Sequence, residues 1–256
     1  MLTRCGYPNR MRGLMLVAVL LCGHLSFGAS ERTPVTLYAV KYGESVYPAA
    51  KLIKGDASGK RLPIAWMFYA VKSGNDIILV DTGFSDAGDA KEFGVTLLPY
   101  QAELAAAGIT PESVTKIVLT HTHSDHAANL PLYPRATVIV NRRETEAAVL
   151  RTVSKDRLIT FDESYQVVPG MTVRRAGGHT HGSSYVELQA GEKTYLLAGD
   201  EAYLPENVSK LQPVGSFTDS AANLTFLTLA KNSGAEVLTF HDPAVVKTGC
   251  VRQIAP

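Results

Sequence analysis

The sequence predicts a mixed α/β fold in which strands predominate and helices are interspersed in both halves of the chain. Short runs rich in β-branched and aromatic residues recur between polar turns, which is the pattern of strands. Helix start and stop residues flank several of the segments between them. Two sheets covered by outer helices fit this pattern, although the pattern alone does not select them. With 256 residues, 46% of them hydrophobic, the chain can bury a sizeable core.

The first half of the chain contains the clearest strand signals. Val35–Val40 is expected to be one strand, and Ile64–Val71 and Asp76–Val80 are expected to pair as a hairpin around Ser73-Gly74-Asn75. The last of these strands is a burst of apolar residues, as in a buried strand. It leads into a polar turn, Asp81-Thr82-Gly83.

A helix and a further strand precede the first histidines. Tyr100–Ala107 is expected to be helical and to end at Gly108. Thr110-Pro111-Glu112 resembles a helix cap followed by proline at the first helical position. Lys116–Thr120 is expected to be a strand, and His121 follows it directly.

The second half repeats this alternation. The expected strands are Thr137–Val140, a short one at Val173, Tyr185–Leu188, Tyr195–Ala198 and Val237–Phe240, and the expected helices are Arg142–Leu150 and Asn223–Lys231. Uncommon polar residues gather in the loops after these strands, where rigid scaffolds usually carry their chemistry.

Residues 1–29 have the organisation of a signal peptide. Three arginines, Arg4, Arg10 and Arg12, precede the apolar run Leu14–Leu21, and small residues follow it. The run is too short to span a bilayer comfortably, although an uncleaved N-terminal anchor is the alternative. We therefore expect a periplasmic or secreted protein with one mature domain, residues 30–256, and no second apolar segment long enough to cross a membrane.

Charge and cysteine content exclude other classes. The formal net charge is +1, so no global field favours nucleic acid. Cys250 is the one cysteine outside the predicted leader, so the mature chain contains no internal disulfide. We expect Cys250 to be structural. The sequence has no Gly-x-Ser-x-Gly nucleophile motif.

The segment His121-Thr122-His123-Ser124-Asp125-His126 carries four potential metal ligands within six residues. Alternation at a strand end would send His121 and His123 to one side, and a following turn could aim Asp125 and His126 at a second centre. Imidazole and carboxylate together suit Zn²⁺ or a similar first-row ion.

Three later strand ends each present one more ligand-type residue: His179 between glycines, Asp200 and His241. A lone histidine or aspartate in such a position is more often a surface or hydrogen-bonded residue. The dense first segment makes a shared metal role for all three the better interpretation. Glycine lets a backbone approach a metal closely, and His181 is expected to be exposed or to lie outside the ligand set.

These four segments, in this order, resemble the metallo-β-lactamase superfamily. The resemblance implies an αββα sandwich with two metal ions at one edge of its sheets, most often Zn²⁺, with Mn, Fe or Co as alternatives. It implies that His121, His123 and His179 hold one ion, that Asp125, His126 and His241 hold the other, and that Asp200 bridges them. Asp81 would orient a ligand imidazole; a plain turn residue is the alternative.

Within that superfamily the chain looks most like the N-acyl homoserine lactonases. Asp200-Glu201-Ala202-Tyr203 places a tyrosine three residues after the bridging aspartate, as in those enzymes. Their Gly-His-Thr-Pro-Gly-His motif occurs here with His181 for proline and Ser183 for histidine, and Ala128 replaces a glycine after the first motif. Trp66, Met67, Phe68 and Tyr69 offer apolar surface, mainly for the core, since strand residues alternate between faces.

The resemblance implies hydrolysis of a lactone or other small-molecule ester by a metal-activated water. Tyr203 would polarise the carbonyl and Asp125 would protonate the leaving alkoxide. Alternatives are a β-lactam, thioester or phosphodiester hydrolase on the same scaffold, or an exported metal-binding protein without turnover.

Overall fold

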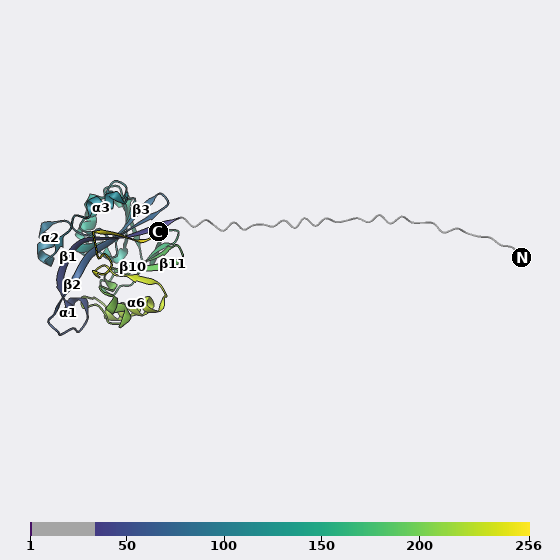
Figure 1. Ribbon diagram of the computed structural model, residues 1–256. Coiled ribbons are helices and arrows are strands. Elements are labelled where there is room, and N and C mark those ends of the chain that lie inside the picture. Colours follow the sequence, from purple (N-terminus) through teal and green to yellow (C-terminus); the bar gives the residue numbers. More distant parts are fainter. Residues whose placement is uncertain (2–33) are drawn as a thin grey trace. The chain divides into compact units, whose positions relative to one another are not determined.

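Eight strands form the larger of two sheets in the computed structural model, which describes Met1 and residues 34–256 (Figure 1). Its order is β13-β1-β2-β3-β5-β6-β7, with β4 paired to β1. The strands are β1 Val35–Pro48, β2 Arg61–Ser73, β3 Asp76–Val80, β4 Thr96–Leu97, β5 Lys116–Val118, β6 Thr137–Asn141, β7 Leu158–Phe161 and β13 Val251–Ala255. The predicted hairpin is confirmed, because β2 and β3 pair antiparallel from Tyr69 opposite Val80 to Ser73 opposite Asp76.

The second sheet has five strands in the order β12-β11-β10-β9-β8. They are β8 Ser164–Val168, β9 Met171–Arg175, β10 Ser184–Ala190, β11 Lys193–Leu197 and β12 Glu236–Leu238. Neighbouring strands from β8 to β11 pair antiparallel, and β12 pairs with β11 in parallel.

Side-chain alternation along β2 divides the apolar residues into layers. Met67 and Tyr69 pack in a cluster that also contains Val186 and Leu188 of β10, so this cluster lies between the two sheets. Trp66 and Phe68 belong to a second cluster on the opposite face of the larger sheet. Because successive strand side chains point to opposite faces, β2 must be apolar on both. The expectation that these four residues are mainly core residues is thereby confirmed.

Helices cover the two outer faces (Figure 1). Ala90 of α2 (Ala87–Phe93) and Leu104 of α3 (Gln101–Ala106) pack on the larger sheet. Val208 of α5 (Pro205–Ser209) and Phe226 of α6 (Ser220–Asn232) pack on the smaller one. Two short helices, α1 (Ala49–Leu52) and α4 (Ser124–Ala127), complete the set. The αββα sandwich is therefore confirmed.

Two local predictions are wrong. Residues 142–150 form no α-helix: Arg142–Glu144 and Ala148–Thr152 are separate 3₁₀ turns, because the Asn141 side chain caps Arg143 and the Glu144 side chain is buried in tertiary hydrogen bonds. The segment after Thr110 is a single turn, closed by Ser113 Oγ bonding to the Thr110 amide and carbonyl. Polar side chains that bond locally compete with helix formation.

The predicted leader lies outside the described residues apart from Met1. Among the helices that the structure describes, none combines the length and the apolar character required of a bilayer span.

Candidate metal centre

Strand direction collects the predicted ligands at one edge of the sandwich. Asp81 follows β3 and His121 comes shortly after β5, which runs parallel to β3. On the other sheet, Asp200 follows β11 and His241 follows β12, again a parallel pair. His179 lies between β9 and β10, and β9 runs in the same direction as β11 because both are antiparallel to β10. The chain therefore delivers polar residues repeatedly to the same edge, as parallel strands do.

All seven predicted ligands come together in two groups. His121, His123 and His179 form one group, and Asp125, His126, Asp200 and His241 form the other; within each group, one ligand-type atom from every residue lies within 4.8 Å of the others. His181 is in neither group and is exposed, as expected.

Asp200 faces both groups at once. Its Oδ2 lies 3.4 Å from His179 Nε2 and 3.9 Å from His121 Nε2. Its Oδ1 lies 3.0 Å from His126 Nε2 and 3.2 Å from His241 Nε2. A carboxylate whose two oxygens point to two sets of nitrogens has the geometry of a bridge between two cations.

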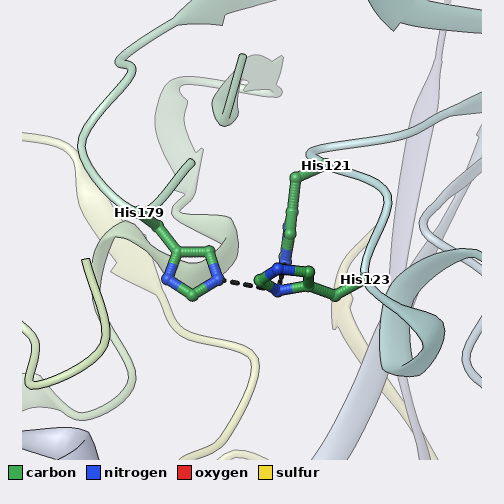
Figure 2. A group of neighbouring side chains, drawn as sticks. All are labelled: His121, His123 and His179. Atoms are coloured by element: carbon green, nitrogen blue, oxygen red, sulfur yellow. Dashed lines mark hydrogen bonds between the residues drawn. The ribbon is translucent and has the colours of Figure 1, made fainter. Parts of the chain in front are cut away.

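In the three-histidine group, formed by His121, His123 and His179, ring nitrogens point toward one another (Figure 2). His123 Nδ1 lies 3.0 Å from the Nε2 atoms of both His121 and His179. One proton on His123 could satisfy only one of these two neighbours. A cation between the three nitrogens would satisfy all of them.

Hydrogen bonds on the outer side fix the tautomers of the other histidines. The Nδ1 atoms of His179 and His241 bond to the carbonyl oxygens of Ser216 (2.8 Å) and Ala65 (3.0 Å), which only accept, so each Nδ1 must carry a proton. His126 Nδ1 donates to Asp81 Oδ2 at 2.7 Å. The electron pair of each Nε2 is thus directed at the centre, the arrangement found in metal-ligating histidines.

His126 Nε2 is a buried polar atom without a hydrogen bond. Asp200 Oδ1 and Asp125 Oδ2 lie 3.0 and 3.3 Å away, but not in hydrogen-bonding directions. Buried polar atoms are nearly always satisfied. The electron-pair donor atoms of each group lie within 4.8 Å of one another, so the residues present fit a metal ion.

Electrostatics favour the charge states that metal binding needs at His121 and Asp200. Burial, and after it the neighbouring His126 and His179, lowers the pKa of the His121 imidazole well below its usual value, which keeps it neutral. Burial opposes ionisation of Asp200, but His126 and His179 outweigh it and hold the pKa of this carboxyl well below its ordinary range. Neutral imidazole and ionised carboxylate are the ligating forms. At His126 burial opposes protonation, but Asp200, Asp125 and Asp81 outweigh it and raise the pKa of this imidazole well above its usual value, so a metal ion that binds there displaces a proton.

Asp81 supports the centre from a strained backbone. It is fully buried, with φ at +67°, a conformation uncommon for residues other than glycine. Its carboxylate accepts from the Thr120 amide (2.7 Å), the Thr120 hydroxyl (2.8 Å) and His126 Nδ1. Strain of this kind persists only where the surroundings impose it, and here it places a carboxylate behind a predicted ligand.

A cavity of about 290 Å³ opens onto the two groups. His123, Asp125, His179, Asp200 and His241 form its polar side, with Tyr203 beside them. Its apolar lining consists of Tyr47, Leu52, Ile64, Trp66 and Phe93. Trp66 also packs edge-on against the His241 ring, with 5.1 Å between ring centroids. The pocket thus joins a reactive end to an apolar wall.

The family model of the metallo-β-lactamase superfamily matches residues 63–238, which contain every residue of both groups except His241. The chain belongs to the metallo-β-lactamase superfamily.

Named relatives in this superfamily are N-acyl homoserine lactonases. One from Bacillus thuringiensis is 27% identical over 209 residues, covering 73% of this chain and 83% of its own. The lactonase AttM of Azorhizobium caulinodans is 30% identical over 166 residues, covering 56% of this chain and 63% of its own.

Solved structures agree in fold. An N-acyl homoserine lactone hydrolase with N-hexanoyl-L-homoserine at its catalytic metal centre aligns with a TM-score of 0.72 at 21% identity, covering 84% of this chain and 96% of that one. AidC, a dizinc quorum-quenching lactonase, aligns with a TM-score of 0.68 at 17% identity, covering 88% and 96%.

Several supporting groups escaped the sequence analysis. The Tyr42 hydroxyl donates to the Asp125 backbone carbonyl at 2.8 Å. Two buried glutamates, Glu144 and Glu201, contact the segments that carry the histidines. The carbonyls of Ala65 and Ser216 leave no trace in side-chain pattern. Of the two glutamates, only Glu201 could have been noticed in the sequence, because it directly follows Asp200.

Protein purified without a chelator is expected to contain two metal ions per chain by elemental analysis. Removing them is expected to lower Tm by roughly 5–15 °C, because a ligand present at 100–1,000 times its Kd stabilises the folded state by about 3–4 kcal/mol. Re-addition of Zn²⁺ should restore Tm. Fewer than two ions per chain, or an unchanged Tm after their removal, would contradict the dinuclear assignment.

Proposed function

We propose that this protein is a dinuclear-metal hydrolase that opens lactones such as N-acyl homoserine lactones. The observation that carries the proposal is the position of Asp200, with one oxygen toward each ligand group, at the polar end of an apolar cavity. The names of the Bacillus thuringiensis and Azorhizobium caulinodans relatives support the same substrate class.

We propose that His121, His123 and His179 hold one ion, that Asp125, His126 and His241 hold the other, and that Asp200 bridges them. Two such ions, when bound, lower the pKa of a shared water toward about 7 and polarise a carbonyl.

Tyr203 is positioned to act on the substrate carbonyl. Its ring centroid lies 5.2 Å from that of His241 and 6.0 Å from that of His179. Burial, followed by the charges of Asp200 and Asp125, raises the pKa of the Tyr203 phenol well above its usual value. The phenol therefore keeps its proton at neutral pH and can donate a hydrogen bond to the oxyanion that develops on the carbonyl oxygen when water attacks.

Asp125 lines the cavity and is suited to carry a proton. Burial opposes its ionisation, but His126 outweighs this effect and lowers the pKa of the carboxyl. Asp125 is therefore ionised at rest. Its Oδ2 can accept the proton released when water attacks and pass it to the alkoxide leaving group.

The apolar lining favours a substrate with an alkyl or acyl chain. Leu52, Ile64 and Trp66 are buried in the protein and still contribute to the cavity wall. Each methylene that such a wall removes from water contributes about 0.8 kcal/mol. We therefore expect kcat/KM for lactones to increase with chain length until the cavity is filled.

A substrate panel on the zinc-loaded chain tests the proposal. Homoserine lactones of increasing acyl length are compared with nitrocefin, a thioester and a phosphodiester. The highest kcat/KM is expected for the lactones. Preference for another class would move the chain to a different hydrolase activity of the same superfamily, and turnover of none would favour a metal-binding protein.

Tyr203→Phe is expected to lower kcat on lactones about 10²–10³-fold, the usual cost of one lost oxyanion donor. Because the phenol is not a predicted ligand, metal content should stay at the wild-type value. Steady-state kinetics with elemental analysis of the same sample checks both. Wild-type turnover in the variant would remove Tyr203 from the mechanism.

We also propose that the enzyme acts in the periplasm or outside the cell. The basic and apolar organisation of residues 1–29 supports export. Mass spectrometry of protein from the periplasmic and extracellular fractions should find a mature N-terminus near residue 30. Full-length protein confined to the cytoplasm would contradict this.

A further inference from the structure

We propose that two buried glutamates, Glu144 and Glu201, brace the loop that carries His179 and thereby set the affinity of the three-histidine metal site. The inference rests on the metal centre proposed above and is independent of the substrate. Both side chains belong to the described core, with Glu201 fully buried and Glu144 8% exposed. Neither is a predicted ligand.

Glu201 ties the loop to the segment that carries Asp200. Its Oε1 accepts from the backbone amides of Gly178 (2.9 Å) and His179 (3.0 Å), and Ser183 Oγ lies 2.5 Å from the same oxygen. Its Oε2 accepts from Asn223 Nδ2 of α6 at 2.7 Å. The two backbone amides and the Asn223 amide can only donate, so the ionised carboxylate fits and a neutral side chain would leave a partner unpaired.

Glu144 ties the same loop to the segment with His121 and His123. Its Oε2 accepts from the Thr122 amide (3.1 Å) and hydroxyl (2.7 Å), and Thr122 lies between those two histidines in the chain. Its Oε1 accepts from the Thr180 hydroxyl (2.6 Å) and the Gly182 amide (3.1 Å). One carboxylate therefore spans both segments that build the three-histidine group.

The glycines of the loop make room for these carboxylates. A Cβ on Gly178 would overlap Glu201 Oε2, and a Cβ on Gly182 would lie 2.7 Å from Glu144 Cγ. No positive φ requires glycine at either position. These two glycines therefore have a role that the sequence analysis did not assign, because they admit the buried carboxylates.

Ser183 belongs to the same arrangement. Its hydroxyl contacts Glu201. Outer partners that orient ligands commonly change metal affinity 10–100-fold when removed. The two glutamates supply such partners through the backbone on either side of His179.

Metal titration of the chelator-treated full chain, with a chromophoric competitor and Zn²⁺ as the probe, tests the brace. His179→Ala serves as a reference, because it removes a ligand and so identifies the binding step that belongs to the three-histidine site. Glu144→Gln and Glu201→Gln are expected to weaken that step 10–100-fold and to leave the other step within threefold of wild type. The absorption spectrum of Co²⁺-loaded protein gives a second readout that a merely structural role would not move.

Glu103→Gln is the matched control. One oxygen of Glu103 also accepts two backbone amides, those of Cys250 and Val251, each at 2.9 Å, but it contacts no ligand segment. The Glu103→Gln variant should bind Zn²⁺ with the affinity of the wild-type protein at both steps. A control that loses as much affinity as the two test variants would overturn the brace.

Milder variants keep the test valid if the glutamine variants fail to fold. Thr180→Val removes a hydroxyl that contacts Glu144, and Ser183→Ala removes one that contacts Glu201. Both variants keep the two glutamate carboxylates. Each is expected to weaken the three-histidine step by about two- to tenfold, the range that corresponds to one ordinary intramolecular hydrogen bond. Wild-type affinity in all folded variants overturns the brace alone, whereas wild-type protein that binds no metal overturns the centre as well.

Discussion

Asp200→Ala is expected to release both metal ions and to lower turnover by at least about 10³-fold. Removing one member of a buried charge cluster costs roughly 3–5 kcal/mol, and the two oxygens of Asp200 face four histidine nitrogens at 3.0 to 3.9 Å. The four imidazoles would then lose the one carboxylate that contacts both ligand groups. Elemental analysis and lactone kinetics on the same preparation measure both effects.

Asp242→Ala is the control for this substitution. Asp242 follows His241 directly, but its carboxylate accepts from the Ala244 amide and belongs to neither ligand group. Two ions per chain and wild-type turnover are expected. If Asp200→Ala also retained two ions, the bridging assignment would be wrong.

Asp81→Asn is expected to weaken the metal site of His126 about 10–100-fold with little change in stability. The amide nitrogen that replaces Oδ2 would donate to His126 Nδ1, which must then give up its own proton. That proton would move to Nε2, the atom that faces Asp125 and Asp200. The wrong tautomer blocks ligation while the fold keeps its shape, and metal titration beside a thermal melt separates the two effects.

Asp81→Ala should behave differently. It leaves the Thr120 amide, the Thr120 hydroxyl and His126 Nδ1 without an acceptor, at about 1–3 kcal/mol for each buried group. Alanine also suits a φ of +67° less well than asparagine does. Tm should therefore fall in the order wild type, Asn, Ala. Equal Tm values for the two variants would show that Asp81 contributes no such support.

Local patterns predicted the parts of the fold that depend on local interactions. The apolar burst at residues 76–80 is strand β3 with the expected bounds, and the hairpin with β2 follows from the turn between them. The predicted helix at residues 142–150 failed because Glu144 is drawn into tertiary hydrogen bonds. Local propensity carries no information about such distant partners.

The spacing of the histidines and aspartates was enough to predict which side chains gather at the metal centre, because such a dense set, repeated after apolar strands, is typical of metal ligands. How these side chains are held depends on contacts that form only when the chain folds. The carbonyls of Ala65 and Ser216 that fix His241 and His179 belong to residues 176 and 37 positions away. A backbone carbonyl is present at every residue, so its role depends on where the chain folds and not on which side chain it bears.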